Sequence, residues 1–135
     1  MTLVPTSSPA TPYQRLGGEA GVHRLTRRLY ALMDTLPQAA ACRAIHPSDL
    51  GHSEQKLFEF LSGWLGGPPL FEQRHGAPML RRRHLGFPIA SAEAEGWLAC
   101  FRQALEETVA DAGLRAFILP RVEALGEHMR NRAAA

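Results

Sequence analysis

The stretch SEQKLFEFLSGWLGGPP, residues 53–69, decides the fold class of this chain. Its apolar side chains recur every three or four residues, which is the period of one face of an α-helix. Ser53 is a predicted N-cap, although Lys56 three residues later leaves no capping box. Two glycines and two prolines at 66–69 end the helix. Its apolar stripe consists of Leu57, Phe60, Leu61 and Trp64.

The same period predicts three more long helices, over residues 18–34, 91–113 and about 114–130. Ser91 is the predicted N-cap of the middle one and Gly113 its predicted end. Pro120 lies inside the last pattern and predicts a kink or a later start. Because no segment alternates with period two for long, we expect an all-α domain.

Residues 35–51 and 66–88 do not show this helical period, because they are rich in proline and glycine. The first can hold only short helical pieces. Irregular segments of about twenty residues are unusual in a compact domain. They suggest that something other than regular helix packing fills the space beside them.

The 135 residues, 45% of them apolar, suit one globular domain, which we expect over residues 13–132. Residues 1–12 are predicted to form a flexible tail and 133–135 a frayed end. No apolar run approaches the ~20 residues of a membrane span. A net charge of +2 gives no indication of a nucleic-acid partner. Without a signal peptide or CxxC motif, we expect a cytoplasmic protein with free Cys42 and Cys100.

His84 is the most informative of the six histidines. It follows three arginines, residues 81–83, and precedes the apolar turn of Leu85 and Phe87. A histidine at the end of a short helix suits an axial ligand of haem iron, and arginines pair well with haem propionates. Spacing alone fits a solvated basic run equally well. Zinc, phosphate-loop and serine-hydrolase motifs are missing from the sequence.

Several motifs in order make the chain similar to the group II truncated haemoglobins over residues 13–132. They are YQRLGG at 13–18, LY at 29–30, FLSGWLGGP at 60–68, GAPMLRRRH at 76–84, FPI at 87–89, WLACF at 97–101 and EHMRN at 127–131. Each motif alone is weak, but the combination is specific.

The resemblance implies a truncated-globin two-over-two helical sandwich around one haem b. His84 matches the proximal iron ligand. Tyr30 and Trp97 match distal residues whose O–H and N–H groups donate hydrogen bonds to the bound ligand. Phe60 and Leu61 match positions that line the pocket. From the residues alone, Tyr30 and Trp97 would be taken as core aromatics.

His46 falls where most of the family has phenylalanine or tyrosine, which resembles a subset with histidine there. From the residues alone, it fits an exposed loop position before Pro47. Counting from His46 puts Ser53 at the distal gate and Leu57 one turn deeper. Four further residues are expected to contact the cofactor. Lys56, Arg81 and Arg83 could pair with its propionates, and Phe87 could cover the haem.

Such a site is expected to bind O2 and also NO, CO or peroxide at an iron with one open axial position. Two or three neutral hydrogen bonds of about 0.5–1.5 kcal/mol each would slow release tens to hundreds of fold. This favours ligand retention, sensing or redox chemistry over bulk oxygen transport. Nitric oxide dioxygenation or peroxide reduction would need a separate reductase, because the chain has no flavin or nicotinamide motif. The alternative is a haem-free helical interaction or regulatory module; both a monomer and a homodimer stay open.

Overall fold

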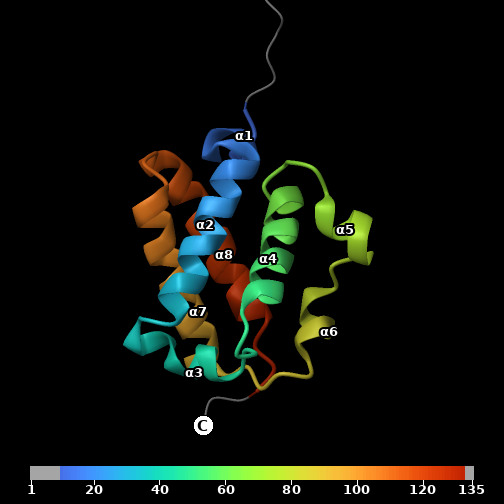
Figure 1. Cartoon of the computed structure of the whole chain (residues 1–135), viewed down its shortest axis with the longest axis vertical. Helices are drawn as coiled ribbons and strands as arrows, with labels where there is room; N and C mark the ends of the chain where they lie inside the picture. The colour runs from blue at the N-terminus through green and yellow to red at the C-terminus, as the bar shows by residue number, and fades with distance from the viewer. Residues whose placement is uncertain (1–9, 133–135) are drawn as a thin grey trace, which may run out of the picture.

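Four long helices carry the structure, a computed structural model that describes residues 10–132 (Figure 1). They are α2 (Gly18–Met33), α4 (Gly51–Trp64), α7 (Ser91–Thr108) and α8 (Ala112–His128). No strand occurs between residues 10 and 132. The prediction of an all-α chain with four long helices is confirmed.

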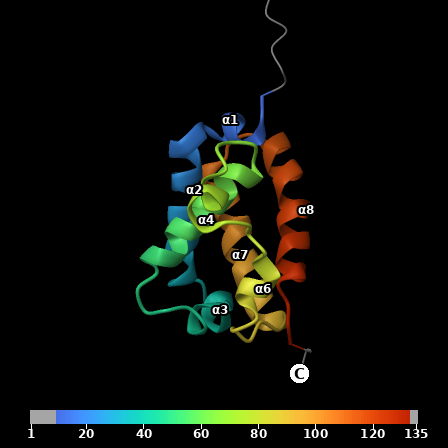
Figure 2. The ribbon, with the colours of Figure 1, turned by 90° about the vertical axis from the view of Figure 1, so that its right-hand side faces the viewer.

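The long helices lie in two layers (Figure 2). One layer pairs α2 with α4, the other pairs α7 with α8, and α2 packs across α7. Their apolar faces meet in one core, as the helical period of the sequence requires. Its largest fully buried side chains include Leu25, Leu29, Met33, Leu61, Phe101, Leu105, Leu114 and Ile118.

Short helices fill the segments between the long ones. Residues 35–51 hold the 3₁₀ turn η1 (Pro37–Ala39) and α3 (Ala40–Ala44), as expected. Residues 66–88, expected to be irregular apart from a short helix ending at His84, hold α5 (Leu70–His75) and α6 (Leu80–His84). Phe71 is the one buried side chain of α5, and α6 buries none.

The start of α4 corrects the predicted N-cap. A carboxylate oxygen of Asp49 accepts a hydrogen bond from the Gly51 amide at 2.8 Å, and the helix begins there with Leu50 as its N-cap. Ser53 therefore lies inside the first turn, and its predicted capping role is wrong.

The junction of α7 and α8 also differs from the prediction. Val109 is extended, which ends α7 at Thr108, and the Asp111 carboxylate then caps α8 by accepting from the Leu114 amide at 3.0 Å. Gly113 thus belongs to α8. This helix runs through Pro120, so the predicted late start is wrong.

At the start of α7, the Glu93 carboxylate accepts from the Ala90 amide at 2.8 Å. Ala90 is therefore the N-cap, and Ser91 is the first helical residue rather than the predicted cap.

The described chain starts with α1 (Pro12–Leu16), whose N-cap is Thr11. Pro12, assigned to the tail above, is therefore helical. The rest of the predicted tail up to residue 9, and the predicted frayed end at 133–135, lie outside the described residues. No helix in the described range is long and apolar enough to cross a membrane.

Candidate functional site

His84 is the last residue of α6, and its ring has a defined orientation. Its Nδ1 lies 2.6 Å from the carbonyl oxygen of Leu80, one turn earlier. A carbonyl oxygen only accepts, so Nδ1 carries the proton and donates. Nε2 makes no hydrogen bond with any residue from 10 to 132. A neutral imidazole held in this way offers the Nε2 lone pair to a metal.

The surface beside His84 is unusually apolar. Between residues 10 and 132, four large apolar side chains are more than 40% exposed, and three of them flank His84 in sequence: Met79, Leu85 and Phe87. The Phe87 ring centroid lies 6.4 Å from that of His84. Exposed apolar side chains gathered around one histidine are typical of a surface that an apolar ligand covers.

Tyr30 brings an unused hydrogen-bond donor from α2. Its side chain is 6% exposed, and its hydroxyl makes no hydrogen bond within residues 10–132. Every fully buried side-chain nitrogen or oxygen in this range has a partner, so the hydroxyl faces a space that protein atoms leave open. Burial raises the pKa of Tyr30 far above its usual range, and nearby Cys42, Glu54 and Cys100 add to this. The hydroxyl therefore keeps its proton.

Trp97 brings a second unused donor from α7. The indole is half-buried, its ring centroid lies 5.4 Å from that of Phe101, and its N–H has no partner between residues 10 and 132. Because α2 and α7 pack on each other, both donors belong to the same helix pair.

His46 lies beside Tyr30, with their ring centroids 6.0 Å apart and the rings edge to face. Its Nδ1 donates to the Cys42 carbonyl oxygen at 2.8 Å, so Nε2 of the neutral ring is an acceptor. Burial lowers the pKa of His46 below 6.5; the Cys42 hydrogen bond opposes this shift, while Arg43 and His84 add to it. The ring is therefore neutral at pH 7.

A close helix crossing fixes the segment that carries His46. A Cβ atom added to Gly96 of α7 would lie 2.9 Å from the Gln38 carbonyl oxygen and 3.1 Å from the Cys42 Cβ. Only glycine lets η1 and α3 approach α7 this closely. Cys42 and Cys100 are buried free cysteines, and burial raises their pKa values to about 12 and about 11. Both thiols stay protonated and unreactive.

The α4 residues predicted for the site lie on different faces of that helix. Leu57 and Phe60 are half-buried, and the Phe60 ring contacts Phe71 of α5 edge to face. Leu61 is buried in the core, whereas Lys56 is exposed and Ser53 is half-buried. Neither Lys56 nor Ser53 has a side-chain hydrogen-bond partner in the described chain.

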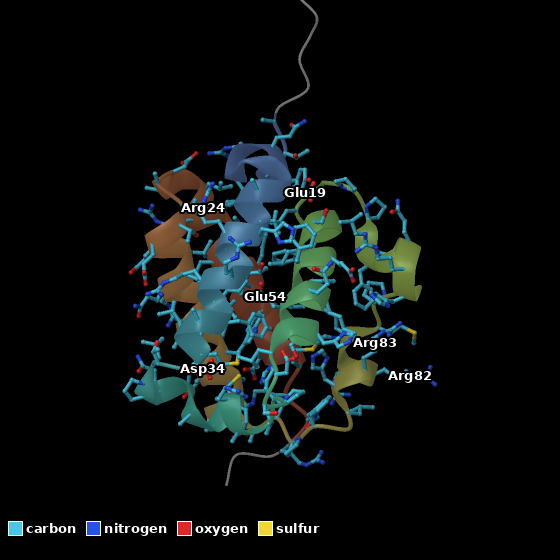
Figure 3. The ribbon with its side chains drawn as sticks, in the orientation of Figure 1. Glu19, Arg24, Asp34, Glu54, Arg82 and Arg83 are labelled. Carbon is cyan, nitrogen blue, oxygen red and sulfur yellow. The ribbon has the colours of Figure 1, made fainter. Side chains whose placement is uncertain are left out.

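The arginines of α6 differ in what they contact (Figure 3). Arg82 points outward, and Arg81 has no ion-pair or hydrogen-bond partner within residues 10–132. Arg83 donates to the carbonyl oxygens of His75 and Ala77 at 2.9 and 3.0 Å. Arg83 was expected to pair with a propionate, but its guanidinium already donates to two backbone carbonyl oxygens.

Three residues near the site were missed by the sequence analysis. Glu54, labelled on α4 in Figure 3, is close enough to Tyr30 to raise the pKa of its hydroxyl. Glu59 is a buried carboxylate between α4 and α5, and Asn131 contacts the backbone of His84. Each of the three is a single polar residue in the sequence, which carries no signal of its contacts in the fold.

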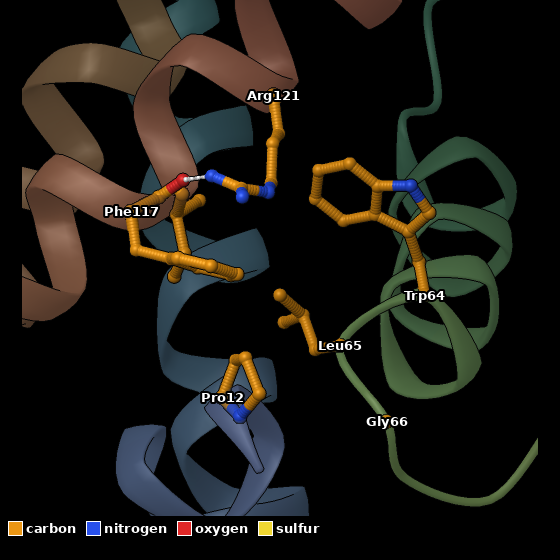
Figure 4. Close-up of a pocket in the computed structure, with 7 residues that line it drawn as sticks. Pro12, Trp64, Leu65, Gly66, Phe117 and Arg121 are labelled. Atoms are coloured by element: carbon orange, nitrogen blue, oxygen red, sulfur yellow. Dashed lines mark hydrogen bonds between the residues drawn. The ribbon is translucent and has the colours of Figure 1, made fainter.

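A hollow of about 380 Å³ lies elsewhere, where α1, the end of α4 and α8 meet (Figure 4). The Arg121 guanidinium lies 3.6 Å from the Phe117 ring centroid there and donates to the Phe117 carbonyl oxygen at 2.7 Å. None of the predicted site residues lines it. Its lining consists of Pro12, Trp64, Leu65, Gly66, Phe117, Ile118 and Arg121.

Comparison with known proteins gives the family. A family model described as bacterial-like globin matches residues 11–131. The group 2 truncated haemoglobin YjbI of Bacillus subtilis is 38% identical over 128 residues, which cover 92% of this chain and 91% of that protein. The chain belongs to the group 2 truncated haemoglobin family.

Solved structures of truncated haemoglobins agree with this assignment. The group II 2-on-2 haemoglobin of Agrobacterium tumefaciens is 53% identical, with a TM-score of 0.91 over 96% of this chain and 99% of that one. The truncated oxygen-avid haemoglobin of Bacillus subtilis is 37% identical, with a TM-score of 0.81 over 90% of this chain and all (100%) of that one. The predicted two-over-two fold is confirmed.

Haem b is the usual cofactor of this family and is the cofactor of this truncated haemoglobin. The residues present fit the group. An imidazole with a free Nε2, three exposed apolar side chains beside it and two unused donors on α2 and α7 are what a haem and its ligand require.

Proposed function

We propose that this truncated haemoglobin uses His84 as the iron ligand of its haem and binds O2 and other diatomic molecules. The observation that carries the proposal is the hydrogen bond from Nδ1 of His84 to the Leu80 carbonyl. It fixes the tautomer that coordinates through Nε2. The haem would supply, when bound, an iron centre that takes up the diatomic molecule.

Tyr30 and Trp97 supply the hydrogen bonds to the ligand. Support comes from the Tyr30 O–H and the Trp97 N–H, neither of which donates to another residue between 10 and 132. Ligands such as O2 gain negative charge on binding, so donors fixed beforehand stabilise the complex. The neutral Tyr30 hydroxyl can only be useful as a donor in this role.

His46 is proposed to give the site a third polar group. In this it would resemble the family subset that has histidine at this position. The bond to the Cys42 carbonyl makes its Nε2 an acceptor at neutral pH. It can therefore accept from the Tyr30 hydroxyl or from a water, but it cannot donate to a ligand until it is protonated. Ser53 and Leu57 are proposed to border the same distal space.

The other cofactor contacts divide by chemistry. Phe60, Leu61 and Phe87 are proposed to contact the apolar faces of the haem. Arg81 and Lys56 are proposed to pair with its propionates, since neither has an acidic partner within residues 10–132.

Retention of the ligand fits this set of donors better than rapid transport, and a solved relative from Bacillus subtilis is described as oxygen-avid. Slow release also suits sensing or chemistry on the ligand. Turnover of NO or peroxide by this chain would draw electrons from a separate reductase.

The test is haem binding by His84→Ala, with His128→Ala as control because His128 lies in the exposed last turn of α8. After reconstitution with haem, the wild type and the control should show the same Soret band and haem content. His84→Ala should lose haem or bind it weakly. Unchanged haem content and spectrum in His84→Ala would refute the ligand assignment. A wild type without a Soret band would favour a haem-free helical module instead.

A further inference from the structure

The segment that carries His84 has little packing of its own. Helix α6 has five residues and no buried side chain, and Leu85 and Phe87 after it are exposed. Isolated helices of this length are unstable in water. The position of His84 therefore depends on contacts with other parts of the chain.

Asn131, the chain's one asparagine, holds the end of this segment. Its Nδ2 donates to the carbonyl oxygens of His84 at 3.0 Å and of Phe87 at 2.9 Å. Its Oδ1 accepts from the Ile89 amide at 3.0 Å, and its own amide donates to the Ile89 carbonyl oxygen at 2.9 Å. The side-chain amide thus uses both donors and its acceptor on residues 84–89, more than 40 positions away in sequence.

Arg83, the fourth of the five residues of α6, ties this helix back to the residues before it. One nitrogen, Nη2, donates to the carbonyl oxygens of His75 and Ala77, and the guanidinium carbon lies 5.1 Å from the Phe71 ring centroid. These contacts join α6 to the end of α5.

A buried carboxylate fixes α5 in turn. Glu59 of α4 is 3% exposed and accepts hydrogen bonds from Arg74, from Nε2 of His75 at 2.8 Å and from Gln55 at 3.1 Å. Burial alone would raise the pKa of Glu59, but these hydrogen bonds outweigh it and hold the pKa below its ordinary value. Glu59 is therefore charged at neutral pH and ties α5 to α4.

We infer that Asn131 and Arg83 are positioning residues that hold α6 against the segment after α8 and against the end of α5, and that they set where His84 meets the iron. Asn131 acts on the backbone of His84 itself, and Arg83 acts through α5 and Glu59. Groups that orient a metal ligand control metal affinity and bond geometry nearly as strongly as the ligand. The inference rests on the proposed role of His84.

The test compares Asn131→Asp and Arg83→Gln with the wild type, all loaded with haem. Asn131→Asp replaces two donors by a carboxylate oxygen facing two carbonyl oxygens, while Arg83→Gln removes the guanidinium. Both should shift the iron–histidine stretching band in the resonance Raman spectrum of the ferrous protein. Both should release haem to apomyoglobin about tenfold faster. In the apoproteins, amides of residues 80–89 should exchange with deuterium faster than in the wild type, with α2 and α7 unchanged.

Arg82→Gln is the matched control, because it removes a neighbouring charge that points outward (Figure 3). It should match the wild type in all three measurements. If both variants, Asn131→Asp and Arg83→Gln, show the iron–histidine band at the wild-type frequency and release haem at the wild-type rate, the inference is overturned. The role of His84 would be unaffected by that result. A wild type that lacks the iron–histidine band would overturn the proposed function itself.

Discussion

Tyr30 and Trp97 each offer one hydrogen that no protein group between residues 10 and 132 uses. We expect Tyr30→Phe and Trp97→Phe each to raise the O2 dissociation rate by about 2- to 10-fold, the effect of losing one neutral hydrogen bond. Stopped-flow displacement of O2 by CO measures this rate. Tyr13→Phe, which removes a hydroxyl from α1, should leave it unchanged. If neither variant differs from Tyr13→Phe, the donor roles are wrong.

His46 should make the release of O2 depend on pH. Its pKa lies below 6.5 because the ring is buried, and the charge of Arg43 adds to this lowering. Above this pKa its Nε2 accepts, and below it Nε2 becomes a donor. The O2 dissociation rate should therefore fall as the pH drops below 6.5 towards the pKa of His46.

His46→Phe removes the group and should give a rate that is flat over this pH range, while His128→Gln should keep the wild-type dependence. Folding stability gives a second check. A lowered histidine pKa means that the native state resists protonation, so stability is full above 6.5 and falls as the pH drops further. Equal acid sensitivity of unfolding in His46→Phe and the wild type would count against this account.

The resemblance to a family pointed to Tyr30, Trp97 and His46, and strengthened the case for His84, because the motifs are specific in combination although each alone is weak. What His84 and His46 can do depends on carbonyl oxygens one turn earlier, at Leu80 and Cys42, which the pattern does not reveal. Asn131 and Glu59 were missed for a different reason. Their partners are brought together only by the fold, and a single polar residue carries no mark of a distant partner.

At the scale of helices, the apolar period located all four long ones, whereas their ends were harder to predict. Side chains just outside the expected limits decide those ends, such as Asp49 at α4 and Asp111 at α8. Of the two short helices α5 and α6, only α6 was expected, from the segment before His84, and α5 escaped detection because it has no sustained apolar period. They are held by Glu59, Arg83 and Asn131 rather than by a hydrophobic stripe.

A substitution at Gly96 tests how the close packing of η1 and α3 on α7 determines the position of His46. Its missing Cβ lets η1 and α3 lie against α7, and an added methyl would meet the Gln38 carbonyl oxygen at 2.9 Å. We expect Gly96→Ala to lower the free energy of unfolding by about 1–3 kcal/mol. Urea unfolding followed by circular dichroism measures this loss. Because α3 leads to His46, the pH dependence of O2 release should also weaken in this variant.

Gly113→Ala is the control for the same chemical change in a helix. There the added methyl has its nearest neighbour, an Asp111 carboxylate oxygen, at 3.4 Å. It should be neutral or stabilise by about 0.4–1 kcal/mol, because alanine restricts the unfolded chain. Equal stability of the two variants would show that the α3–α7 contact is not tight.

Across the whole molecule, the core and the segment of His84, the proposed iron ligand, are held by different means. The buried core joins α2, α4, α7 and α8, Leu70 of α5 packs against it, and no residue of α6 belongs to it. The apoprotein should therefore keep its long helices while residues 80–89 exchange amide hydrogens rapidly. Circular dichroism and hydrogen exchange of the apoprotein check the two halves of this statement. Rapid exchange throughout α2 and α7 would contradict it.

Haem binding should then join the weak segment to the core and stabilise the whole chain. A ligand that binds only the folded protein adds about 2.7 kcal/mol when its free concentration is 100 times its Kd. Thermal unfolding should occur at a higher temperature with haem than without it, and most of this gain should vanish in His84→Ala. The His84→Ala apoprotein should unfold at the wild-type apoprotein temperature, because its half-buried side chain lies outside the core. An equal gain from haem in His84→Ala would mean that the haem is held chiefly by residues other than His84.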